Sequence, residues 1–478
     1  MLTRLDFDGE NLRSEADGLY ELRNVRMGQR LYHDFLKPPH ILTQYTPLFY
    51  LVPGLIARGI HATDLDTFFI GRSFVWISWL SVGVMIYGLA RQAGCEQRFA
   101  AIGGLLWLGG HLATAWAFSY RPDSVALALS LGALLVYRGG TRGGRWTGVV
   151  LVLLIVAFLH KQSAICAWMV IVWEEYRANR FGRATMFSCG WVGALAAIVW
   201  ATNRLTDGAF VLNVFESTAK LALSQQRLYP VVALVSGAGV FAGGALACSL
   251  LAAYGPTKLL KHYFVVALSV AFVSSAKAGG NVNYFLEPFA VGCILSSILL
   301  QQCWRRMVGR SAIFAASIWL SFLLGPTLDV TWQRFRRLPE DAREIMEHGA
   351  RRKTRDEAWQ NVLIRLNAAA EPALIEDPYL ALRVGGPPYL LNGANFGGMQ
   401  RDGTFDDSAL LRMVQAGGFG IIVTTFPVEA TAKRRAFPDR WLVPIRNRYC
   451  LAESVSGFYI YRPRSAGTFG PTSPTDHK

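Results

Sequence analysis

Apolar residues of this chain fall in long blocks between short polar loops, and they do not form the stripes of amphipathic helices. Such blocks are typical of helices that have lipid as their solvent, and about 20 residues are needed to cross the hydrocarbon core. Several blocks are shorter, so their helices must extend into polar flanks. The pattern predicts about ten membrane helices, at residues 68–90, 99–118, 124–138, 146–160, 162–176, 184–203, 229–253, 263–278, 285–301 and 311–328.

Polar regions lie on both sides of these blocks. We expect residues 1–67 to form an acidic outer loop with interfacial helices. Within this region the stretch 45–60 is apolar, but Pro53 and Gly54 interrupt it. We therefore predict that this stretch is a helix that lies at or dips into the membrane interface and does not cross the bilayer.

Beyond residue 328 the composition becomes polar for about 150 residues. Residues 329–370 predict a basic helical linker, residues 371–464 a small α/β domain, and residues 465–478 a disordered tail. The expected strands of the domain are residues 373–376, 389–391, 420–424 and 457–461, and its expected helices are 378–384 and 406–416. The predicted fold class is mainly α: a polytopic membrane helical bundle over residues 68–328 with a small C-terminal α/β domain.

Lys and Arg are divided unevenly between the two sets of alternate loops, thirteen in one set and six in the other. The richer set is expected to face the cytoplasm. With ten membrane helices, both ends of the chain then lie on the side opposite the cytoplasm, so the C-terminal domain is predicted to be extracytoplasmic. The first residues, MLTRLDFDGE, hold no signal peptide or anchor that would carry them across, so we expect a further membrane helix upstream of this sequence.

The composition agrees with a membrane protein, since 52% of the residues are hydrophobic and only 17% are charged. A net charge of +15 raises the question of nucleic acid, but the Arg residues lie mostly between the apolar blocks and in one outer segment. Membrane topology therefore accounts for much of the excess. Of the seven cysteines only Cys450 lies in the polar tail, so the tail cannot form an internal disulfide.

Polar residues that are costly near a membrane gather on the predicted outer face. Lys161 and Lys277 are expected to line a cavity, because a cation at this depth is unfavourable unless it is paired or hydrated; snorkelling to the interface is the alternative. Arg121 and Asp123 either belong to the same site or pair with each other as a structural clip. The candidate residues of this face are Glu15, Asp17, Asp34, Lys37, Arg121, Asp123, Lys161, Gln162, Lys277, Asn281, Asn283, Tyr284 and Glu287.

Carboxylates on a loop above several cations suit the transfer of a group away from a phosphate. A carboxylate can take a proton from an acceptor hydroxyl while cations neutralise the phosphate leaving group. Cations at this depth also lie where a lipid-linked phosphate presents its head group. The same residues leave a transporter and a lipid-binding protein open as alternatives.

The order of these motifs resembles the GT-C superfamily of membrane glycosyltransferases, which includes the protein O-mannosyltransferases and the bacterial aminoarabinose transferases. The likeness runs from about Glu15 to Pro326, with the outer domain behind it. Each motif is weak alone, and their order and common outer placement carry the likeness. The motifs are Glu15-Ala16-Asp17-Gly18, residues 28–35 (GQRLYHDF), Lys37-Pro38-Pro39, residues 45–48 (YTPL), Tyr120-Arg121-Pro122-Asp123, Lys161-Gln162 and residues 283–286 (NYFL).

The resemblance implies a polyprenyl-phosphate sugar as donor, a lipid, polysaccharide or protein as acceptor, and the inner membrane of a bacterium as location. It implies inversion at the anomeric carbon, with Asp17 as base and Glu15 as its partner, or the reverse. Residues two apart share a face only in an extended loop, so both can act only if the loop is not helical. The implied donor-phosphate residues are Arg121, Lys161, Lys277 and Lys37, and the implied pocket residues are Asp34, Asp123, Gln162, Asn281, Asn283, Tyr284 and Glu287.

Two departures from the resemblance stand out. Relatives often carry adjacent Asp-Glu, whereas Ala16 separates the two carboxylates here. Relatives also begin with a helix that crosses to the outside just before the acidic loop, which agrees with the upstream helix expected from the charge count.

Two other classes of protein remain open. A transporter or flippase of lipid-linked sugars would place polar residues at the membrane midplane, and a non-catalytic scaffold would use the α/β domain to bind a partner. The eight histidines are scattered and show no metal-ligand spacing, so no metal site is predicted. Acidic oxygens leave Mg²⁺ or Mn²⁺ open as a cofactor. There is no Gly-rich phosphate loop after a strand, which argues against a nucleotide-sugar donor.

Overall fold

The apolar blocks form helices because lipid offers no hydrogen-bond partner, so each backbone must satisfy its own polar groups. The computed structural model shows them in two units: a helical unit (Met1–Tyr32 and Thr43–Glu340) and a C-terminal unit (His33–Leu42 and Asp341–Lys478). Everything below concerns the residues that the structure describes. These are residues 15–140, 144–217, 234, 237–251, 254–275, 281–306, 360–367, 372–384, 387–429, 437–455 and 457–464.

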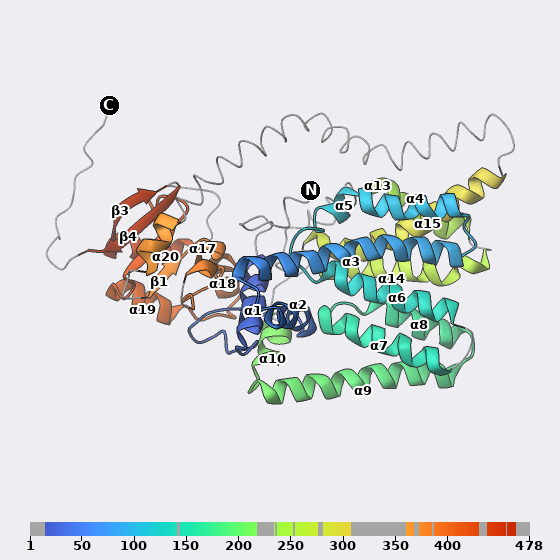
Figure 1. Cartoon of the computed structure of the whole chain (residues 1–478), viewed down its shortest axis with the longest axis horizontal. Coiled ribbons are helices and arrows are strands. Elements are labelled where there is room, and N and C mark those ends of the chain that lie inside the picture. The colour runs from blue at the N-terminus through green and yellow to red at the C-terminus, as the bar shows by residue number, and fades with distance from the viewer. Residues whose placement is uncertain are drawn as a thin grey trace, which may run out of the picture. The chain divides into compact units, whose positions relative to one another are not determined.

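The helical unit follows the predicted blocks with one interruption. The block at 99–118 is two helices, because the first ends at Gly109 and the next begins at His111. The broken stretch 45–60 contains a helix despite Pro53. The last predicted block, 311–328, lies outside the described residues. The helices of this unit are α1 (Glu15–Met27), α2 (Leu48–Gly59), α3 (Asp64–Gln92), α4 (Gln97–Gly109), α5 (His111–Thr114), α6 (Asp123–Gly139), α7 (Gly144–His160), α8 (Cys166–Arg177), α9 (Phe181–Leu205), α10 (Ala209–Val211), η2 (Leu212–Glu216), α13 (Ala238–Leu250), η3 (Gly255–Thr257), α14 (Lys258–Ser275), η4 (Val282–Phe285) and α15 (Leu286–Arg306) (Figure 1).

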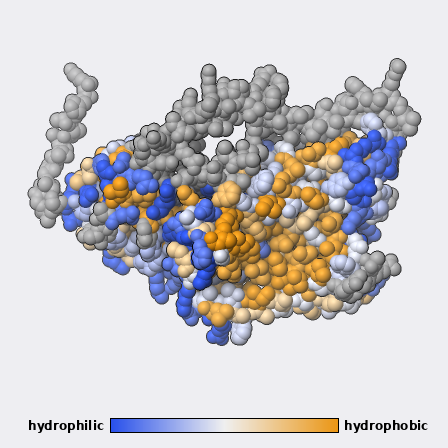
Figure 2. Space-filling model, viewed as in Figure 1, coloured by the Kyte–Doolittle hydropathy of each residue, from blue (hydrophilic) through white to orange (hydrophobic). Residues whose placement is uncertain are grey.

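Four of the described helical segments are long and apolar enough to cross a membrane: Asp64–Gln92, Phe181–Leu205, Gly255–Ser275 and Val282–Arg305. The last of these, which contains α15, is the most enclosed, with 83% of its apolar stretch buried inside the structure. Figure 2 shows hydrophobic residues gathered over the helices of this unit, with hydrophilic residues toward the helix ends. This distribution is that of an integral membrane protein, in which the outward-facing side chains contact lipid.

The first three helices approach one another closely through glycines. A Cβ atom at Gly54 of α2 would lie 2.5 Å from Cγ1 of Val25 in α1. A Cβ atom at Gly71 of α3 would lie 2.6 Å from Cδ2 of Leu22, also in α1. Small residues let helix backbones approach to this degree. The two glycines therefore set the position of α1 against both neighbours.

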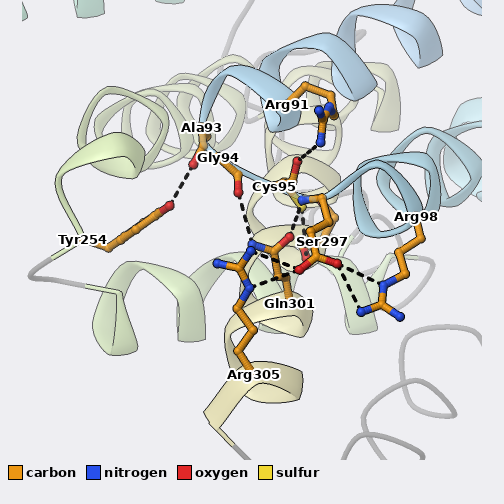
Figure 3. Close-up of polar contacts among 10 residues, drawn as sticks. Arg91, Ala93, Gly94, Cys95, Arg98, Tyr254, Ser297, Gln301 and Arg305 are labelled. Atoms are coloured by element: carbon orange, nitrogen blue, oxygen red, sulfur yellow. Dashed lines mark hydrogen bonds and ion pairs between the residues drawn. The ribbon is translucent and has the colours of Figure 1, made fainter.

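The turn between α3 and α4 is held by hydrogen-bond donors from other segments of the helical unit (Figure 3). The hydroxyl of Tyr254 donates to the Ala93 carbonyl at 3.0 Å, and Nε2 of Gln301 donates to the Gly94 carbonyl at 3.1 Å. The last carbonyls of a helix have no partner within the helix, so such donors satisfy them. The turn is thereby fixed to α15 and to the residue before η3.

The C-terminal unit contains a four-stranded sheet with the order β1-β2-β4-β3. The pair β1-β2 is parallel, and the other two pairs are antiparallel. Because β1 and β2 are parallel, helices connect them along the chain. The elements of this unit are β1 (Ala373–Ile375), α17 (Pro378–Arg383), α18 (Gly393–Arg401), α19 (Ser408–Ala416), β2 (Ile421–Thr424), α20 (Asp439–Arg448), β3 (Tyr449–Val455) and β4 (Phe458–Pro463).

The prediction for this unit was right for most elements and wrong for four. The helix α18 was missed because three glycines lie in it, and Gly is unfavourable inside a helix. The segment 389–391 is not a strand; only Leu390 forms a bridge, with His40. The strand β3 was missed because it is a largely exposed edge strand without a buried face to mark it. The helix α20 was missed because Pro444 lies inside it, and Pro normally indicates a helix end.

Residues 33–42 belong to the C-terminal unit, although the sequence grouped them with the outer loop. The backbone of His40 donates to the carbonyl of Tyr389 at 2.8 Å and accepts from the amide of Leu391 at 3.0 Å. Phe35 is fully buried, and its ring lies 6.2 Å from that of Phe396. The C-terminal unit therefore incorporates the middle of the loop that joins α1 to α2.

The approach of α1 and α2 can be tested with two glycines of one helix. We expect Gly54→Ala to lower the free energy of unfolding by about 1–3 kcal/mol, because the new methyl group overlaps Val25. Gly59→Ala is the matched control, since a Cβ atom there would meet nothing within 4 Å. Thermal unfolding of the purified protein in detergent measures both. Equal melting temperatures for the two variants would contradict the packing described here.

Candidate functional site

The two acidic residues of the first outer segment lie in a helix and not in an extended loop. Glu15 and Asp17 are both in the first turn of α1. Residues two apart on a helix point about 200° away from each other. The condition under which both carboxylates share one face is therefore not met, and the two side chains have different surroundings.

Glu15 forms a buried ion pair with Arg72 of α3. Nε of Arg72 lies 2.9 Å from Oε1 of Glu15 and Nη2 lies 3.0 Å from Oε2. The amide of Tyr120 also donates to Oε1 at 2.7 Å. Both side chains of the pair are at most 1% exposed. Sequence reasoning missed Arg72, although a single cation inside an apolar block was the available signal.

Asp17 lies close enough to Arg121 to interact with it electrostatically. It is 7% exposed, and its carboxylate acts electrostatically on the guanidinium of Arg121, as Asp123 does. The Nη1 atom of Arg121 also donates to the hydroxyl of Tyr45 at 2.5 Å, and its guanidinium lies over the ring of Trp116 at 5.6 Å. Arg121 is thus held by an aromatic ring and a phenol between two carboxylates.

A second cation, Lys161, lies just after α7 and pairs with Asp123 at the start of α6. Nζ of Lys161 is 2.5 Å from Oδ1 of Asp123, and Nδ2 of Asn283 donates to the same oxygen at 2.8 Å. The ammonium group also lies 5.0 Å from the ring centre of Tyr284. The structure therefore pairs Asp123 with Lys161 at hydrogen-bond distance, which the sequence left open.

Lys161, Asp123, Asn283 and Tyr284 line a small cavity of about 40 Å³ in the helical unit. That volume has room for about three water molecules. Apolar side chains of α6 and α14 form part of the lining of this cavity. The polar lining residues are Asp123, Ser130, Lys161, Ser163, Asn283, Tyr284 and Glu287.

The structure brings together only part of the predicted set. The side chain of Gln162 donates to the carbonyl of Gln44 at 3.1 Å, and that of Asn281 caps η4. Oε1 of Glu287 accepts from the hydroxyl of Tyr263 at 2.6 Å. Tyr45 and Tyr263 are contributors that the sequence did not single out as site residues.

Two predicted residues belong to the C-terminal unit, and a third is not among the described residues. Asp34 and Lys37 form an ion pair of 3.1 Å in the part of the loop that belongs to the C-terminal unit. Lys277 lies outside the described residues. Within the described part of the chain, no three His, Cys, Asp or Glu side chains are grouped so as to hold a metal ion.

The chain forms a bundle of apolar helices followed by a small α/β unit. This is the GT-C fold of membrane glycosyltransferases. Among solved structures the chain is similar to ArnT from Cupriavidus metallidurans in the apo state, with a TM-score of 0.59 and 15% identity over 96% of both chains. It is equally similar to the same protein bound to undecaprenyl phosphate, with a TM-score of 0.59 and 14% identity over 98% of this chain and 96% of that one.

A third similar structure is the oligosaccharyltransferase of Archaeoglobus fulgidus in the apo form. The TM-score is 0.54 and the identity 12%, over 87% of this chain and 66% of that one. No family model and no curated protein matches the sequence. The similarity is thus one of fold, at identities too low to carry residue roles across.

The buried ion pair gives a test of how α1 is held. Removing one partner of such a pair costs about 3–5 kcal/mol, because the other charge stays buried without its partner. We therefore expect Arg72→Met and Glu15→Gln each to lower the melting temperature strongly, and the double variant to be less destabilised than the sum of the two. Effects that simply add in this double-mutant cycle would contradict a direct pair.

Proposed function

We propose that this protein is a glycosyltransferase that moves a sugar from a polyprenyl-phosphate donor to an acceptor hydroxyl on the extracytoplasmic face of the membrane. The observation that carries the proposal is Asp17, a buried carboxylate that acts on the guanidinium of Arg121 as Asp123 does, while Asp123 itself is paired with Lys161. The fold supports it, because the similar ArnT was solved with undecaprenyl phosphate. The similar archaeal oligosaccharyltransferase AglB was solved with a dolichol-phosphate and an inhibitory peptide.

Asp17 is the proposed base. It takes the proton of the acceptor hydroxyl, whose oxygen then attacks the anomeric carbon of the donor sugar. The bond from that carbon to the phosphate oxygen breaks, the configuration inverts, and the electron pair leaves with the polyprenyl phosphate. A general base of this kind contributes about 10²- to 10⁴-fold to the rate.

Arg121 and Lys161 are the proposed holders of the donor phosphate. A cation can bind an incoming phosphate only if its existing partner yields or shares it. Arg121 is bonded to the hydroxyl group of Tyr45, and Lys161 is bonded to Asp123 and lies over the face of Tyr284. Lys37 and Lys277 remain proposed donor-phosphate residues, and a divalent cation remains open as a cofactor.

The proposed pocket for the sugar is in the helical unit, where Asp123, Asn283, Tyr284 and Glu287 line the cavity. Gln162 and Asn281 of the same unit are further proposed pocket residues. Asp34, which belongs to the C-terminal unit, stays a prediction. The acceptor, whether lipid, polysaccharide or protein, and the sugar itself remain to be identified by assay.

Glu15 is not proposed as the base, because both of its oxygens accept hydrogen bonds from Arg72 and Tyr120. Its proposed role is to hold the start of α1, and hence Asp17, in place.

Asp17→Asn tests the base directly. We expect the rate of transfer to fall about 10²- to 10⁴-fold, because the amide cannot accept the proton, while the melting temperature changes little. The assay offers a panel of undecaprenyl-phosphate-linked hexoses and pentoses to the full chain in detergent. Asp207→Asn is the matched control, because Asp207 is 81% exposed in the same unit. Unchanged transfer by Asp17→Asn would remove the mechanism.

Binding of undecaprenyl phosphate alone tests the cations. A hydrogen bond to a charged group contributes about 1.5–3 kcal/mol, so Lys161→Gln and Arg121→Gln are each expected to raise the Kd about tenfold or more. Lys258→Gln, at an exposed lysine of the same unit, should leave the Kd unchanged. Equal affinities for all three variants would contradict the assignment. If the protein in vesicles moved a lipid-linked sugar across the membrane without transferring the sugar to an acceptor, this would instead support a flippase.

A further inference from the structure

Glu21 is a second buried acid on the helix that carries the proposed base. It follows Asp17 by four residues, and residues four apart lie on the same face of a helix. Its side chain is fully buried, and the mechanism above gives it no role. A fully buried carboxyl group is unfavourable unless its oxygens are hydrogen-bonded, so its contacts indicate why it is there.

The contacts of Glu21 connect α1 to two other segments. The hydroxyl of Thr43 donates to Oε1 of Glu21 at 2.6 Å, and Nδ2 of Asn24 donates to Oε2 at 3.3 Å. The amide of Thr43 donates in turn to Oδ1 of Asn213 at 2.9 Å. Asn213 lies in η2, a single π-helical turn, and its Nδ2 donates to the carbonyl of Ala209 at 2.8 Å.

Thr43 begins a four-residue connector segment, Thr43–Thr46, whose other members reach the cation side of the site. The carbonyl of Gln44 accepts from Gln162, and the hydroxyl of Tyr45 accepts from Arg121. The hydroxyl of Thr46 donates to the carbonyl of Phe158 near the end of α7 at 2.8 Å. Each residue of the connector segment is thus hydrogen-bonded to a different residue of the helical unit, and two of these partners, Gln162 and Arg121, are candidate site residues.

The groups that face Glu21 favour its neutral form. Burial raises the pKa of Glu21 to about 8, against the opposing hydrogen bonds from Thr43 and Asn24, and the carboxylate of Asp17 raises it further. The other titratable groups that interact with it are the phenols of Tyr20, Tyr32 and Tyr50. These phenols are neutral at physiological pH because their ordinary pKa is about 10.

We propose that Glu21 is a positioning residue of the transferase: as a neutral acid it bonds α1 to Thr43 and so sets Asp17 in register with the connector segment and Arg121. This inference rests on the proposed function, in which Asp17 is the base and Arg121 holds the donor phosphate. Ionisation of Glu21 places a second negative charge on the face of Asp17 and opposes this arrangement. Transfer is then expected to decline at alkaline pH.

The same ionisation makes stability depend on pH. An unfolded carboxyl group ionises near pH 4.5, whereas Glu21 in the folded protein ionises near pH 8. Between these values the folded state holds a proton that the unfolded state has lost, so stability falls as pH rises through this window. Glu21→Gln cannot ionise and should lack this part of the decline.

The experiment compares the wild type with Glu21→Gln and Glu21→Ala in the full-length chain between pH 6 and 9.5. Glu21→Ala is expected to lower kcat about tenfold to a hundredfold, because a small displacement of a catalytic group is costly. Its affinity for undecaprenyl phosphate should change less than about threefold, since Arg121 and Lys161 remain. Glu21→Gln should recover most of the activity, flatten the alkaline decline of kcat, and lack the fall in melting temperature that the wild type shows between pH 6 and about 8.

Glu216→Gln is the matched control, because Glu216 is an exposed glutamate of the same unit, and it should follow the wild type at every pH. Glu21→Ala with normal kcat, or Glu21→Gln with the wild-type dependence of melting temperature on pH, would overturn the inference. Failure of the proposed function is distinguishable: the wild type would then neither transfer sugar nor bind undecaprenyl phosphate. The difference in melting temperature between wild type and Glu21→Gln would still report the buried acid.

Discussion

The bidentate ion pair between Glu15 and Arg72 is the interaction on which the geometry of the candidate site depends. It joins the start of α1 to α3, the first helix long enough to cross the membrane, and through the Tyr120 amide it also fixes the residue before Arg121. A buried pair of this kind contributes little net stability, because the cost of desolvating both charges offsets their attraction. Its effect is specificity, since any other placement of α1 would leave a charge buried without its partner.

Once α1 is placed, the other parts of the site follow from packing and from the connector segment. Gly54 and Gly71 let α2 and α3 approach α1, so the helix that carries Asp17 has little freedom to shift. The connector segment then bonds α1 on one side and Gln162 and Arg121 on the other. Held from both sides, the proposed base and the proposed phosphate-binding cations are preorganised, and preorganised charges supply much of the rate enhancement of enzymes.

The C-terminal unit enters this arrangement through the chain itself. Residues 33–42 are built into its core by Phe35 and His40, while the neighbouring residues Tyr32 and Thr43 are buried in the helical unit. The loop between α1 and α2 is therefore anchored at both ends and in its middle.

The sequence by itself determined the membrane class, most helix positions and the residue types of the site, because lipid and charge leave strong local signals. Apolar blocks identified α3, α6, α9 and α15, and the cost of a cation near lipid singled out Lys161 and Lys277. It could not determine which side chains meet. Whether Asp123 pairs with Arg121 or Lys161, and whether Glu15 or Asp17 faces the cations, depends on helix rotation and on partners more than 30 residues away in the chain. Arg72 and Glu21 stood unremarked for the same reason, since only the tertiary structure shows that each has a buried partner.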